Sequence, residues 1–111
     1  MKRVDDKPLK DAGFKLPVFI SQLVWDHIVA TDKIIEMYGW GESNRLWDVL
    51  NALAWAIFNQ ADMQAVHGTE VRFAVLALLR GRGQSVKMHK VPLKAVFLSD
   101  EQGHRIEVKR P

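Results

Sequence analysis

The sequence predicts an α+β domain in which a helical hairpin packs on one face of an antiparallel meander sheet of three to four strands. Three observations lead to this prediction. The first half of the chain carries apolar residues at helical spacing. The second half changes to the alternating pattern of strands, and glycine-rich turns separate its segments. The length, 111 residues, is that of one domain with one core.

The N-terminal segment, residues 1–12, is polar and charged around Pro8, and only Val4 and Leu9 offer apolar surface. We expect a flexible arm of mixed basic and acidic residues, followed by a single α+β domain over 13–111. The basic side chains of the arm could contact a phosphate backbone, but acidic residues lie among them. A solvated arm is therefore the preferred interpretation.

A short extended segment is expected over residues 17–20, because Pro17 disfavours the helical conformation for the residue before it. This segment would be the fourth strand. A helix that begins at Pro17 is the alternative, and the sequence leaves it open. Ser21 is a suitable N-cap for a first helix over 22–38, which Gly39 would end.

The central stretch, residues 43–60, predicts a second helix that supplies much of the core. Its apolar residues recur at steps of four, three and four: Leu46, Leu50, Leu53 and Ile57. Trp47, Ala54 and Phe58 run beside them, so we expect Trp47 and Phe58 to be buried as well. The link over 39–42 is short, which favours an antiparallel pair of helices.

The second half of the chain predicts three strands. Alternation over 71–80 indicates a first strand with one fully apolar face, followed by a glycine-rich turn. A second strand covers 86–98, where Pro92 marks an edge position, a bulge or a break between two strands. The last strand is expected over 104–109, after a turn whose Gly103 suits a left-handed backbone.

The composition narrows the classes of protein to consider. Hydrophobic residues make up 48% and charged residues 26%, which is typical of a globular protein. The chain has no cysteine, so no disulfide can form, and we expect a cytoplasmic protein. The longest apolar-rich run, 49–58, is too short to cross a membrane. Asp5 and Asp6 interrupt what could begin as a secretion signal. We therefore expect a protein that is neither secreted nor embedded in a membrane and that has no membrane partner.

Three motifs carry a resemblance: F-x-x-P-V-x-I-S-x-x-V-W at 14–25, R-L-W-D-V-L at 45–50 and V-P-L-K at 91–94. Through them the chain resembles a family of small proteins that is catalogued as a domain of unknown function. Bacterial plasmids, phages and conjugative elements are its main carriers. The likeness covers about residues 12–98. It implies an accessory protein of a mobile genetic element that acts by binding a host or defence protein, and it transfers no catalytic residue.

The residues that could support catalysis or bind a metal do not form a known motif. His27, His67, His89 and His104 have no partner at the spacing that places two ligands on one helix face. A folded site that gathers histidines with Asp26 is the less favoured alternative. The chain also lacks the sequence context of a phosphate-binding loop or a nucleophile elbow. We therefore expect a non-enzymatic protein without a metal or a cofactor.

The tryptophans provide the candidate protein interface. Trp40 and Trp55, with Asp48 nearby, could form an exposed patch for a partner protein or for a second copy of this chain. Packing of both tryptophans in the core is the alternative. For Asp48 we favour a structural role, in which it pairs with Arg45 or caps a neighbouring amide.

The basic C-terminal third is the second candidate surface. Residues 69–111 contain nine basic and four acidic residues, a net charge of +5, whereas residues 18–68 have a net charge of −4. The polar solvent face of an ordinary sheet is the alternative explanation, because Phe73 and Phe97 look committed to the core and leave no ring to stack bases. We therefore rank a protein-binding accessory protein first, a nucleic-acid-binding module second and a structural homodimer third. The candidate nucleic-acid contacts are Arg80, Arg82, Lys87, Lys94, Arg105 and Lys109.

Overall fold

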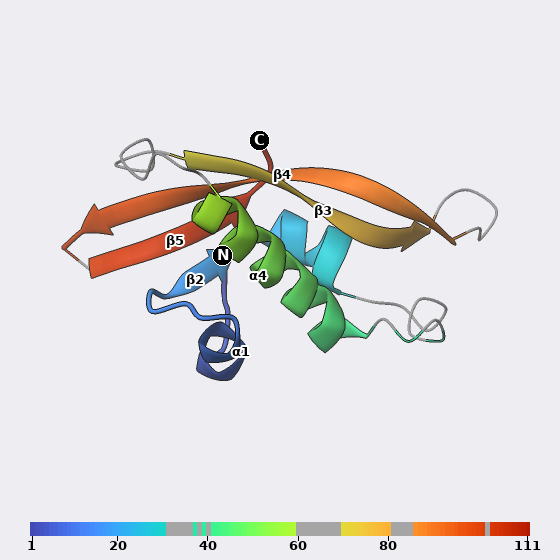
Figure 1. Ribbon diagram of the computed structural model, residues 1–111, viewed down its shortest axis with the longest axis horizontal. Coiled ribbons are helices and arrows are strands. Elements are labelled where there is room, and N and C mark those ends of the chain that lie inside the picture. The colour runs from blue at the N-terminus through green and yellow to red at the C-terminus, as the bar shows by residue number, and fades with distance from the viewer. Residues whose placement is uncertain (31–36, 38, 40, 60–69, 81–85, 102) are drawn as a thin grey trace.

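A computed structural model describes residues 1–30, 37, 39, 41–59, 70–80, 86–101 and 103–111 of the protein (Figure 1). The fold is α+β, as predicted. One sheet forms a layer, and the described helices lie together on one side of it (Figure 1). The apolar core fills the space between the two layers.

The sheet has five strands in the order β1-β2-β5-β4-β3. The three C-terminal strands are antiparallel neighbours, as predicted, but β2 runs parallel to β5. The sheet is therefore mixed, and the prediction of a purely antiparallel meander is wrong. A parallel pair needs a long crossover, which the chain between β2 and β5 supplies. The strands are β1 Lys2–Arg3, β2 Val18–Ile20, β3 Glu70–Arg80, β4 Val86–Asp100 and β5 Gly103–Lys109.

Strand β2 resolves the two alternatives for residues 17–20. Val18 and Ile20 are fully buried and pair with Ile106 and Val108 of β5. The strand ends at Ser21, whose hydroxyl accepts a hydrogen bond from the Val24 amide at 3.3 Å. The predicted N-cap is therefore confirmed, and a helix beginning at Pro17 is wrong.

Pro92 lies within β4, which continues through it without a break. β4 pairs with β3 from Val86 to Val96, whereas its pairing with β5 begins only at Lys94. Pro92 is therefore outside the β4–β5 ladder. Of the three interpretations of this proline, the structure supports the edge position, where a missing amide donor costs little.

The described helices are α1 Asp6–Asp11, α2 Gln22–Val24, the π-helix η1 Trp25–Val29 and α4 Glu42–Asn59. None of the helices in this part of the chain is long and apolar enough to cross a membrane. The helix predicted over 22–38 ends at Val29 within the described region, because Ala30 is extended with ψ of 135°. Residues 31–36, 38 and 40 lie outside the described residues, so a helical hairpin is not shown.

Residues 1–12, expected to be a flexible arm, form β1 and α1 in the structure. Val4 and Leu9 are buried in the core. The Val4 amide donates to the Val18 carbonyl at 2.9 Å, and the Lys2 ammonium lies 4.1 Å from the centroid of the Trp25 ring. The segment thus contributes both apolar and polar contacts to the domain.

Helix α4 is the helix predicted over 43–60, and it buries Val49, Leu50 and Leu53 completely. The expectation that Trp47 and Phe58 are also buried is wrong. Trp47 is 38% exposed and Phe58 is 84% exposed. The apolar stripe is wider than the surface that the sheet can cover, and these two residues lie at its uncovered edge.

Candidate functional site

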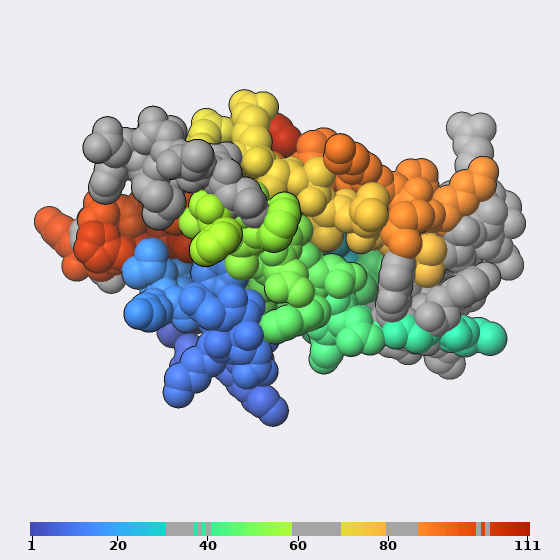
Figure 2. Space-filling model, in the orientation of Figure 1, coloured from blue at the N-terminus to red at the C-terminus, as the bar shows by residue number. Residues whose placement is uncertain are grey.

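The outward face of α4 carries large apolar side chains. Trp47, Trp55 and Phe58 follow each other along one face with Asn51 between them, at steps of four, four and three residues. Trp55 is 71% exposed and Phe58 84%. Figure 2 shows α4 at the surface between the N-terminal segment and β3. Exposed aromatic residues that gather in this way are typical of binding surfaces.

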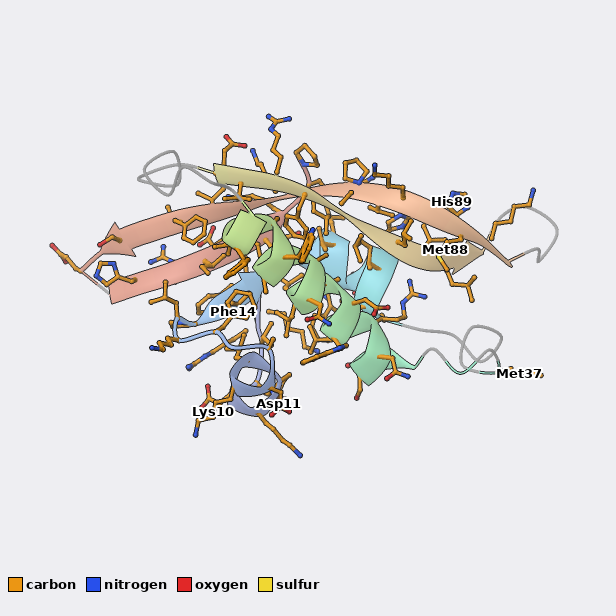
Figure 3. The ribbon with its side chains drawn as sticks, in the orientation of Figure 1. Lys10, Asp11, Phe14, Met37, Met88 and His89 are labelled. Carbon is orange, nitrogen blue, oxygen red and sulfur yellow. The ribbon has the colours of Figure 1, made fainter. Side chains whose placement is uncertain are left out.

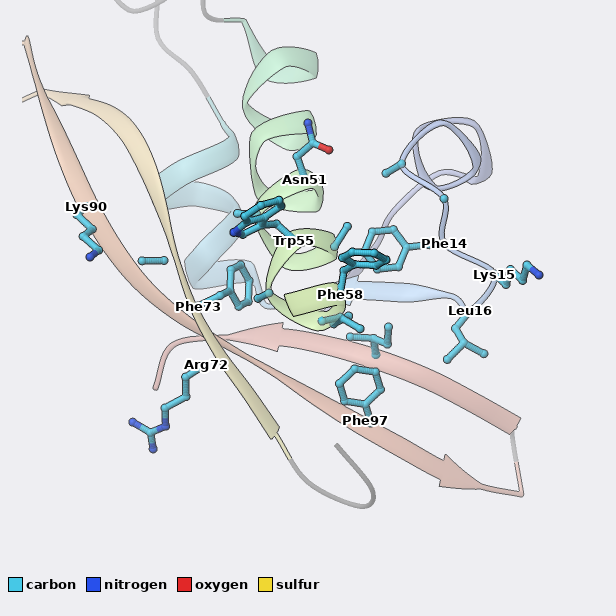
Figure 4. A pocket seen from close by; sticks show the side chains of 18 residues that line it. Phe14, Lys15, Leu16, Asn51, Trp55, Phe58, Arg72, Phe73, Lys90 and Phe97 are labelled. Atoms are coloured by element: carbon cyan, nitrogen blue, oxygen red, sulfur yellow. The ribbon is translucent and has the colours of Figure 1, made fainter. Parts of the chain in front are cut away.

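Trp55 and Phe58 border an open groove of about 1560 Å³ (Figure 4). Its other walls come from the segment after α1 and from the sheet. Phe14 lies between α1 and the C-terminal half of α4 (Figure 3). We call this feature the aromatic groove, and its aromatic lining residues are Phe14, Trp55, Phe58, Phe73 and Phe97.

The polar lining of the aromatic groove is sparse. It consists of Lys15, Asn51, Arg72 and Lys90, and no carboxylate is present among the described lining residues. The side chains of Lys15 and Arg72 point away from the rings (Figure 4). This arrangement can bury apolar side chains of a ligand and attract negative charge at its rim. Within the described lining it presents no nucleophile and no acid–base pair.

The two described residues of the predicted protein interface, Trp55 and Asp48, lie in different places on α4. Trp55 lines the aromatic groove. Asp48 lies two turns earlier on α4, in a small depression that β3 and Ile28 also line. Trp40 is outside the described residues. Of the two described residues, Trp55 lines the groove and Asp48 does not.

Arg45 is a structural residue whose burial the sequence analysis did not predict. It is only 2% exposed. Its Nε donates to the Ile28 carbonyl at the end of η1, and its Nη1 donates to the Leu78 carbonyl of β3 at 2.6 Å. Arg45 lies four residues before Val49, which is fully buried, and residues four apart share one face of a helix. This spacing could have revealed the burial of Arg45.

Asp48 is half-buried on α4, one turn after Arg45. Burial raises the pKa of the Asp48 carboxyl, and the nearby Arg45 guanidinium opposes this shift. Because the pKa is raised overall, the cost of desolvating the Asp48 carboxylate exceeds the benefit of its attraction to the Arg45 cation. No catalytic base or nucleophile accompanies Asp48 among the described residues of this depression.

The predicted nucleic-acid contacts fall on both faces of the sheet. Lys94 and Lys109 are directly opposite each other, and Arg105 follows on the same face of β5. Lys87 pairs with Leu79, whose side chain packs against the core, so Lys87 points to the other face. The backbone of Arg80 ends β3, but its side chain lies outside the described residues, as does all of Arg82.

The histidines do not gather into a metal site in the described part of the chain, where no cluster of three or more potential ligands occurs. His67 is outside the described residues. Burial lowers the pKa of His27, and the positive charges of Arg110, Arg45 and His89 lower it further. His89 is thus an electrostatic neighbour of His27.

Comparison with family models, curated proteins and solved structures gave no match for this chain. The resemblance to a family carried by mobile elements therefore stays a prediction.

Proposed function

We propose that this protein is a non-enzymatic binding protein that holds an apolar segment of another protein in the aromatic groove. In the setting that the resemblance implies, the partner is a host or defence protein and the chain is an accessory protein of a mobile genetic element. The observation that carries the proposal is the exposure of Trp55 and Phe58, 71% and 84%, on a well-formed helix.

The aromatic residues support a protein partner because such rings supply most of the binding energy in many interfaces. Trp55 and Phe58 are already held on α4, whose inner face is packed against the sheet. A partner would therefore bury large rings on a rigid helix, so little ordering of the backbone would be needed on binding.

The size and polarity of the aromatic groove favour a protein segment over a small molecule. The groove measures about 1560 Å³. Small-molecule sites are usually about 300–1,000 Å³ and contain a few convergent polar groups that orient the ligand. The polar groups here lie at the rim, which suits a segment that inserts two or three apolar side chains.

The charge of the rim indicates the chemistry of the segment. Lys15 is exposed and positively charged at this rim, whereas the strand register turns the side chains of Arg72 and Lys90 toward the opposite face of the sheet. The described lining contains no acid. We therefore expect an amphipathic segment with large apolar side chains on one face and carboxylates beside them.

The test is selection from a displayed library of random peptides, followed by titration of the selected peptides against purified variants. Trp55→Ala and Phe58→Ala should each weaken binding at least about tenfold, because they remove central aromatic contacts. Leu23→Ala is the matched control. Leu23 is 74% exposed on α2 and does not line the groove, so its loss should change affinity less than about twofold.

Two outcomes would contradict the proposal. One is that selected peptides bind Leu23→Ala as poorly as Trp55→Ala. The other is that the protein has the mass of a dimer by light scattering and becomes monomeric when Phe58 is changed to alanine. That result would assign the groove to a second copy of this chain.

A further inference from the structure

We propose that the sheet face opposite α4 binds the phosphate backbone of a nucleic acid through three cations, Arg72, Lys94 and Lys109. We call these residues the cation row. They come from β3, β4 and β5, which are neighbours in the sheet. The register places Arg72 opposite Lys94, and Lys94 opposite Lys109. This function would be additional to the proposed protein binding.

The three side chains share one face because side chains alternate along a strand. The residues beside them in the chain, among them Leu93, Ala95 and Val108, are buried in the core. The cation row therefore points away from the core, and the described helices lie on the core side (Figure 1). Lys90 and Arg105 extend the same face along β4 and β5.

The row concentrates positive charge more than sheet stability would favour. Neighbouring strands are about 4.7–4.9 Å apart, so the backbone positions of the three cations span about 10 Å. Like charges directly opposite each other destabilise a sheet. A ligand that carries several negative charges would remove this repulsion.

Among the described residues, the carboxylates of this face contact the row only at its ends. The Nε of Arg72 lies 3.6 Å from the Oε2 of Glu70. The carboxylate of Glu107 lies 3.5 Å from the Nζ of Lys109 and 3.2 Å from the Nε of Arg105. Both acids pair with Val96, which lies two residues after Lys94 on the same face of β4. Lys94, in the centre of the row, makes no ion pair with any described residue.

A phosphate backbone fits this arrangement because it repeats its negative charge about every 3.4 Å along each strand of a duplex. A row of about 10 Å can therefore contact two or more phosphates of one strand. Phe19 on β2 pairs with Glu107 and therefore lies on the same face of the sheet. It is half-buried, and it is the aromatic residue of this face in the described part of the chain. Binding should thus depend on phosphates, with little preference for sequence.

Fluorescence anisotropy with labelled DNA of about 20 nucleotides, single-stranded and duplex, tests the inference at about 50 mM salt. Lys94→Gln combined with Lys109→Gln should weaken binding at least about tenfold. The control combines Lys7→Gln with Lys87→Gln, which removes the same charge from exposed sites off this face and should cost less than about twofold. Neither Lys94 nor Lys109 lines the aromatic groove, so peptide binding should be unchanged.

Two further measurements sharpen the test. Raising the salt from about 50 to 200 mM should weaken duplex binding roughly 40-fold if three phosphates are contacted. Glu107→Gln should tighten binding, because it removes the negative charge that lies beside Lys109 and Arg105, and it should do so more than Glu42→Gln on α4.

The inference is overturned if no DNA binds at low salt, or if both double variants lose the same affinity. Binding to vesicles that contain phosphatidylserine, without binding to DNA, would also overturn it.

Discussion

The inner and outer faces of α4 are both apolar in sequence, but they differ in what covers them. Val49, Leu50 and Leu53 are fully buried against the sheet, whereas Trp55 and Phe58 are mostly exposed beside the aromatic groove. The same helix therefore supplies the core and the proposed binding surface. We therefore expect substitutions on the inner face to change the stability of the fold, and substitutions on the outer face to change the affinity for a partner.

The largest expected effect is on the inner face. Leu50→Ala should lower the free energy of unfolding by roughly 2–5 kcal/mol, because it leaves a cavity beneath α4. Phe58→Ala is the matched change on the outer face and should stay within about 0.5 kcal/mol of the parent. Urea denaturation of both variants checks the pair. Equal losses would show that the two faces are not separate.

Arg45 provides the next test, because it belongs to the inner face although it is charged. Arg45→Met keeps the apolar part of the side chain but leaves the carbonyls of Ile28 and Leu78 without their donors. The loss should be roughly 1.5–3 kcal/mol, the usual range for hydrogen bonds to charged groups. An unchanged denaturation midpoint would mean that water satisfies both carbonyls.

Leu9 extends the comparison to the N-terminal segment. Leu9→Ala should cost about 2 kcal/mol, the lower end of the range for this change, because α1 is a short helix at the periphery. Leu23→Ala, on an exposed site, is the control. Thermal unfolding measures both, and a Leu9 variant that melts like the parent would support the flexible arm that the sequence predicts.

The smallest effect concerns pH. The pKa of His27 is lower in the folded protein than its ordinary value of 6.5, so the unfolded chain binds more protons near this pH. Stability should therefore fall as the pH is lowered through 6.5 towards the folded pKa. His27→Gln should flatten this part of the stability–pH curve. The same slope in parent and variant would contradict the assignment to His27.

The periodicity of the sequence was sufficient to predict α4 and the three C-terminal strands, because their apolar residues recur at steps that only one structure type satisfies. Periodicity does not specify which strands are neighbours, and the parallel pairing of β2 with β5 was missed for that reason. Trp47 and Phe58 were misplaced because a wide apolar stripe does not show which of its edges the sheet will cover.

The candidate sites were less predictable because they combine distant segments. Trp55 was recognised, but its groove also requires Phe14 and Phe97, which only the folded chain brings together. The cation row depends on register, and Arg72 was missed for that reason. The opposite direction of Lys87 was predictable in principle, because Lys87 and Lys94 are seven positions apart on one strand and an odd step reverses the face.

A nuclear magnetic resonance titration with a selected peptide tests the central claim most directly. If the outer face of α4 is the binding surface, the indole N–H signal of Trp55 should shift with added peptide while the signal of the buried Trp25 stays in place. An unchanged Trp55 signal, at peptide concentrations that saturate binding, would contradict the claim.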